Sequence, residues 1–111
     1  MIDVNLKAGF VKVYRGTRWI DGIKVLVDEE PLDPRYDLKQ IAKGGFEWTY
    51  EGEGPAQLAL AILADHLEDD QQALSLYEAY MHQVISDLDN DWEVTSDEVA
   101  ESIATLTSRE P

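Results

Sequence analysis

The chain has 111 residues, of which 44% are hydrophobic and 29% charged, so it is long enough to bury about two thirds of its surface in one domain. It contains no cysteine, which excludes disulfides, thiolate metal sites and thiol nucleophiles. Its 23 acidic and 9 basic residues give a net charge of −14, which disfavours direct binding to a nucleic-acid backbone or an anionic membrane. We expect residues 1–111 to form a single cytoplasmic domain with residues 1–8 frayed, because neither a signal segment nor a bilayer-length apolar stretch is present.

The first third of the chain favours β structure. Residues Phe10–Tyr14 alternate apolar and polar, Arg15–Arg18 predicts a turn, and Trp19–Val27 resumes an extended pattern. Asp33 then stands as the N-cap of a short helix over Pro34–Lys43, which the following glycine would end.

An aromatic strand and two long helices are expected in the middle of the chain. Residues Phe46–Tyr50 alternate aromatic and polar side chains and therefore predict a strand. The turn Gly52–Pro55 follows, and we interpret it as a tight turn that lets this strand pack on the next helix. A helix over residues 55–68 is apolar nearly all round, as a central core helix would be, and a second helix runs from residue 70 to Leu88.

The last elements are a short extended segment and a helix. Trp92–Val94 is extended, Thr95 and Glu98 have the spacing of a capping box, and a helix covers Ser96–Leu106. The predicted fold is therefore α+β, with a small antiparallel sheet of about three strands packed on a helical hairpin and a C-terminal helix.

The central part of the chain is similar to a known family. The string GFEWTYEGEGPAQLALAIL over residues 45–63, followed by Asp65-His66-Leu67 and by Ala73 to Tyr77, resembles small uncharacterised domains from bacteria and their phages. That family has no established activity, so the resemblance implies a fold unit over roughly residues 10–100. The similarity to phage-borne members favours an accessory or anti-defence role.

Charge is distributed very unevenly along the sequence. The part up to Pro55 carries ten acids and eight bases, whereas the part after it carries thirteen acids and a single base, Arg109. Between Lys43 and Arg109 there are fifteen acidic residues and no basic one. Three explanations fit this pattern: a solubilising surface, adaptation to high salt, or an acidic face that engages a basic partner.

The leading hypothesis is a non-enzymatic interaction protein that presents carboxylates to a protein with a basic surface. In its sharpest form the carboxylates mimic nucleic-acid phosphates and occupy the groove of a nucleic-acid-binding or host-defence protein. Antiparallel packing of the two long helices would place residues 87–93 near Glu51 and Glu53, away from residues 65–70. The candidate surface comprises Glu51, Glu53, Asp65, Glu68, Asp69, Asp70, Asp87, Asp89, Asp91 and Glu93.

An alternative reading is a small calcium-binding domain. Residues 87–98 can be aligned with a twelve-residue calcium loop, although Trp92 stands where such loops need a residue tolerant of a left-handed turn. The candidate ligands are Asp87, Asp89, Asp91, Glu93 and Glu98. No other cofactor is expected, and a structural module without any ligand is the third hypothesis.

Overall fold

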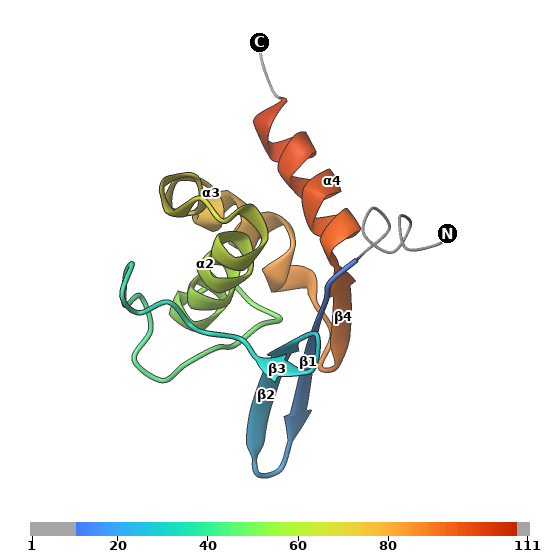
Figure 1. Ribbon diagram of the computed structural model, residues 1–111. Coiled ribbons are helices and arrows are strands. Elements are labelled where there is room, and N and C mark those ends of the chain that lie inside the picture. The colour runs from blue at the N-terminus through green and yellow to red at the C-terminus, as the bar shows by residue number, and fades with distance from the viewer. Residues whose placement is uncertain (1–10, 109–111) are drawn as a thin grey trace, which may run out of the picture.

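In the computed structural model, which describes residues 11–108, an antiparallel sheet packs beside three helices (Figure 1). The sheet has four strands in the order β3-β2-β1-β4, and the fold is α+β as predicted, with one strand more than expected. The strands are β1 (Val13–Trp19), β2 (Gly22–Val27), β3 (Glu30–Pro31) and β4 (Trp92–Thr95). The helices are α2 (Glu53–Leu67), α3 (Asp70–Gln83) and α4 (Ser96–Thr107), with a 3₁₀ turn, η1 (Ile85–Asp87), after α3. Within this described part of the chain, no helix has the length and hydrophobicity to cross a membrane.

The first two strands form one continuous hairpin. The turn predicted at residues 15–18 is wrong, because these residues lie inside β1 and pair with residues 23–26 of β2. The chain reverses instead at Ile20 and Asp21, and Gly22 takes the positive φ of 136° that this reversal needs. Ile20 is 98% exposed at the tip of the hairpin.

Strand β4 completes the sheet from the far end of the sequence. The predicted extended segment Trp92–Val94 is confirmed, and it pairs with β1 so that Trp92 lies opposite Gly16. A Cβ atom on Gly16 would stand 2.3 Å from Nε1 of Trp92, so this position admits no side chain. The Trp92 ring packs edge to face against Trp48, whose side chain is fully buried, with the ring centroids 5.7 Å apart.

The three helices lie close to their predicted positions. Every residue from Pro55 to Ala64 in α2 is buried, which confirms a central core helix. Helix α3 ends at Gln83 instead of Leu88, and the chain tightens into η1 where the N–H of Thr49 donates to the carbonyl of Ile85 at 3.2 Å. The predicted capping box is confirmed at the start of α4.

Two predicted elements are absent, and residues 32–52 form one long irregular loop. The helix predicted over Pro34–Lys43 is wrong: Arg35 has a left-handed φ of 59°, and the Asp33 carboxylate accepts from the Arg35 N–H instead of capping a helix. The strand predicted over Phe46–Tyr50 is also wrong, because a φ of 82° at Thr49 breaks the alternation.

A single buried side chain holds this loop against α2. The amide oxygen of Gln57 accepts from the N–H groups of Ile41 at 2.7 Å and Ala42 at 3.0 Å. Its amide nitrogen donates to the carbonyls of Pro34 at 2.8 Å and Lys39 at 3.1 Å. Gln57 is fully buried, and these four hydrogen bonds pair both its amide group and the backbone groups of the loop.

Candidate partner-binding surface

Most acidic side chains between residues 44 and 108 have no Lys or Arg partner in the described part of the chain. Fifteen acids and no Lys or Arg lie between residues 44 and 108. Four of these acids reach bases of the N-terminal part: Glu47 to Arg18 at 2.7 Å, Asp65 to Lys12 at 3.0 Å, Asp70 to Arg35 at 3.2 Å and Glu93 to Arg15 at 3.5 Å. Within residues 11–108, the other eleven pair with no Lys or Arg.

The acidic residues of the predicted cluster at 65–70 make hydrogen bonds and ion pairs within the fold. The Asp65 carboxylate accepts from the Tyr14 hydroxyl at 2.7 Å and from the Lys12 ammonium at 3.0 Å. Burial, reinforced by this bond, raises the pKa of Tyr14 and keeps it protonated as a donor. The Asp69 side chain caps α3 and accepts from the Gln72 N–H, while Glu68 ends α2 with a left-handed φ of 55°.

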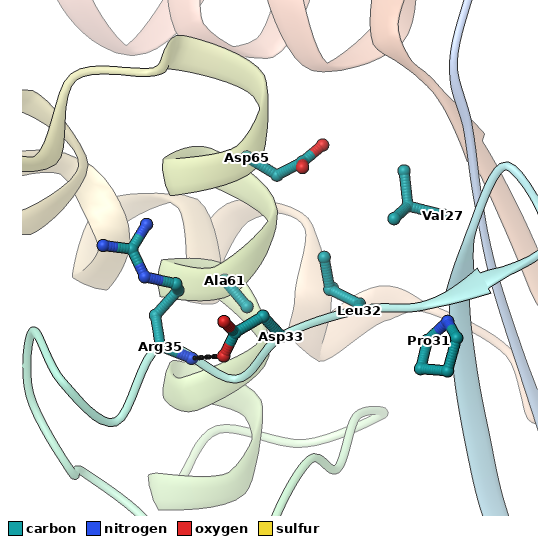
Figure 2. A pocket seen from close by; sticks show the side chains of 7 residues that line it. All are labelled: Val27, Pro31, Leu32, Asp33, Arg35, Ala61 and Asp65. Atoms are coloured by element: carbon teal, nitrogen blue, oxygen red, sulfur yellow. Dashed lines mark hydrogen bonds between the residues drawn. The ribbon is translucent and has the colours of Figure 1, made fainter.

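A cavity of about 310 Å³ lies beside Asp65 (Figure 2). Asp33 and Arg35 also line it, together with apolar residues that include Leu32 and Ala61. The Arg35 guanidinium binds both carboxylate oxygens of Asp37 at 3.0 Å, and this bond lowers the pKa of Asp37. Asp65 is thus paired with Lys12, whereas the Arg35 guanidinium bonds to Asp37 and to Asp70 at 3.2 Å, and Asp33 accepts only from the Arg35 backbone N–H.

The segment that holds the second predicted cluster adjoins the segment that leads into α2. The N–H of Thr49 bonds to Ile85, and Trp48 Nε1 donates to the carbonyl of Asn90 at 3.1 Å, so the start of α2 adjoins η1 and the turn after it. Glu51 reaches His82 Nδ1 at 3.0 Å. We call the five exposed carboxylates at this end of the molecule the acidic end: Glu51, Glu53, Asp87, Asp89 and Asp91.

The residues of the predicted calcium loop lie in different settings. Trp92 occupies a strand, the Asp91 carboxylate accepts from the Arg18 N–H at 3.3 Å, and Glu93 pairs with Arg15. The Glu98 carboxylate accepts from the Thr95 N–H at 2.9 Å within the capping box. Among the residues that the structure describes, no three His, Cys, Asp or Glu side chains form a group that could hold a metal. Calcium binding here stays a prediction from spacing.

The comparisons with known proteins assign no activity to the chain. A family model described as a family of unknown function (DUF6166) matches residues 14–105. No curated protein and no solved structure matches the chain. Function therefore has to be inferred from the residues and their arrangement.

Proposed function

The chain belongs to the family of unknown function DUF6166, and we propose that it is a non-enzymatic binding protein whose acidic end docks on a basic surface of a partner protein. The observation that carries this proposal is the gathering of five exposed carboxylates from two segments more than thirty residues apart in sequence. None of the five pairs with a Lys or Arg within residues 11–108.

Electrostatics favours a partner of opposite charge. Carboxylates within a Debye length of about 8 Å repel one another at physiological salt, and a cationic surface would relieve that repulsion. The two segments are also held in place, since Trp48 bonds to Asn90 and Thr49 bonds to Ile85 across them. A pre-arranged surface of this kind loses little conformational entropy when it binds.

The sharpest form of the proposal is charge mimicry of nucleic acid. Carboxylates on a fixed scaffold would stand in for phosphates and occupy the groove of a nucleic-acid-binding or host-defence protein in the cytoplasm. The resemblance of residues 45–63 to phage-borne domains supports an accessory or anti-defence role of this kind. Such binding would release counterions and weaken steeply as salt rises.

The test is affinity capture with the immobilised full chain at low and high salt, from the organism that carries the gene. A test variant, Asp87→Asn with Asp89→Asn, is compared with a control, Asp21→Asn with Glu30→Gln, which removes the same charge from the hairpin turn and β3. We expect the immobilised chain to capture a basic protein and to release it at high salt. The test variant should bind that protein about tenfold more weakly, whereas the control should bind it as tightly as wild type does. Equal weakening of both variants, or binding that ignores salt, would contradict the proposal.

A further inference from the structure

The tip of the β1–β2 hairpin exposes two adjacent large apolar side chains. Ile20 is 98% exposed and Trp19 is 56% exposed, and neither packs against the hydrophobic core of the described residues. Figure 1 shows this end of the hairpin projecting away from the three helices. Adjacent apolar residues on a projecting element are typical of a protein contact site, because the fold itself does not bury them.

The turn does not require these side chains. Tight turns favour Gly, Pro, Asn, Asp and Ser, and Asp21 and Gly22 follow this preference whereas Ile20 does not. The backbone pairing of β1 with β2 continues to Trp19 and Gly22, so the hairpin is held without a contribution from the Ile20 side chain. The fold alone therefore gives no reason for a β-branched apolar residue at this position.

The exposed Trp19 ring is held in one place. The ammonium group of Lys24 lies 5.0 Å from the ring centroid, which is close enough for a cation–π contact. An ordered aromatic side chain loses little conformational entropy on binding, and Trp is enriched among the residues that contribute most to protein interfaces. Lys24 and Asp21 carry opposite charges, so the tip itself is neutral and offers mainly an apolar contact.

The tip adjoins the acidic end and is fixed relative to it. The Asp91 carboxylate accepts at 3.3 Å from the N–H of Arg18, the residue before Trp19. The Arg18 guanidinium lies 4.6 Å from the ring centroid of Trp48 and donates to the Trp48 carbonyl at 3.3 Å. Trp48 in turn donates to the carbonyl of Asn90. One partner surface can therefore contact the tip and the acidic end together.

Charge and area decide what covers the tip. A second copy of this chain carries the same net charge of −14, and a two-fold contact through the tip would bring two acidic ends together. An anionic membrane is repelled for the same reason. Two side chains also cover much less than the roughly 800 Å² that each partner buries in a stable interface, so the tip needs the adjoining acidic end to complete one. This combination favours a basic protein.

We propose that Trp19 and Ile20 enter an apolar pocket of the basic partner, while the acidic end contacts basic residues around that pocket. This inference rests on the proposed function, because it assigns the tip to the partner that the acidic end attracts. It adds an anchor that salt does not screen, since burial of apolar surface involves no pair of charges.

The first test is photo-cross-linking in cells of the organism that carries the gene, with p-benzoylphenylalanine in place of Ile20 in the full chain. The control carries the same photoreactive residue in place of Glu78, an exposed residue of α3. We expect the label at position 20 to join the chain to the basic protein that the acidic end captures, and the control to form no such product. A product of two joined copies of this chain, a product with a different protein, or no product would each reject the proposal.

The second test measures the affinity of the captured protein for variants of the full chain across a range of salt concentrations. Trp19→Ser with Ile20→Ser should weaken binding about tenfold or more at every salt concentration. The salt dependence should stay as in wild type, because no charge changes. Asp21→Asn with Glu30→Gln leaves the apolar pair in place and should bind as tightly as wild type. Ile20→Ser alone should also weaken binding but leave the melting temperature unchanged, because this side chain is almost fully exposed.

The two proposals fail separately. If the double serine variant binds the partner as tightly as wild type does, the tip is rejected and the acidic end stands. If that variant loses binding while capture ignores salt, the acidic end is rejected and the apolar contact stands.

Discussion

Replacing Gln57 with methionine should unfold the long loop and strongly destabilise the protein. Methionine matches the size of glutamine but cannot bond to Ile41, Ala42, Pro34 or Lys39. At about 1 kcal/mol for each of four lost hydrogen bonds, the free energy of unfolding should fall by about 4 kcal/mol. A domain of this size has about 5–15 kcal/mol in total, so the loss is a large fraction of its stability.

The assay is thermal and urea unfolding of the full chain, with Gln71→Met as the control. Gln71 is an exposed residue of α3, and its replacement should change the free energy of unfolding by less than about 0.5 kcal/mol. For Gln57→Met we expect the melting temperature to fall by about 15–30 °C. A loss below about 1 kcal/mol would refute the reasoning, because the loop would then be ordered without its buried amide.

Two further substitutions test the sheet and the helix end. Gly16→Ala should lower the free energy of unfolding, measured in urea, by about 3 kcal/mol, because the new Cβ would meet the Trp92 ring. The control Gly44→Ala, which has open space around it, should change the free energy of unfolding little. Equal effects of the two substitutions would contradict this packing. Burial lowers the pKa of His66 below its ordinary value of 6.5, with Lys12 adding to the effect. The folded state therefore binds fewer protons than the unfolded state, so this contribution to stability is present above pH 6.5 and is lost as pH falls through the folded pKa. His66→Gln should flatten that decline in urea midpoints measured across this range, and an unchanged slope would refute the assignment.

The elements with strong apolar periodicity were predictable from the sequence. Residues Leu58–Ala64 are apolar on all sides, and such a segment has few alternatives to the centre of the core. The capping box of Thr95 and Glu98 is a local pattern that needs no distant partner, and it is confirmed. The nearness of residues 87–91 to Glu51 followed from the antiparallel helices alone.

The elements that depend on distant partners were not predictable. The segment Pro34–Lys43 has helix signals at both ends. Four of its backbone groups nevertheless hydrogen-bond to the Gln57 side chain, and the segment is irregular. Phe46–Tyr50 alternates like a strand, but Trp48 has its partner in Asn90 and the backbone turns at Thr49. The sequence signal for this loop is Gln57, a polar residue inside an otherwise apolar helix, which needs hydrogen-bond partners from elsewhere in the chain.

The same reasoning explains the outcome for the candidate surface. Exposed acids look alike in a sequence, and composition cannot tell which of them meet Lys12 or Arg35 from the other half of the chain. Pairing across the fold removes Asp65, Asp70 and Glu93 from the available carboxylates. Of the ten candidate residues, seven have no Lys or Arg partner in the described part of the chain: the five of the acidic end, and Glu68 and Asp69 at the turn between α2 and α3. The proposal is therefore narrower than the sequence alone would make it.

The most direct test of a docking role for the acidic end is carbodiimide cross-linking of the complex with its captured partner, followed by mass spectrometry. This reagent joins a carboxylate to a lysine amine that touches it, so it identifies the acids at the interface. We predict cross-links from Glu51, Glu53, Asp87 and Asp89 to lysines of the partner. Cross-links confined to acids elsewhere, such as Asp28, Glu30 or Glu101, would contradict the account.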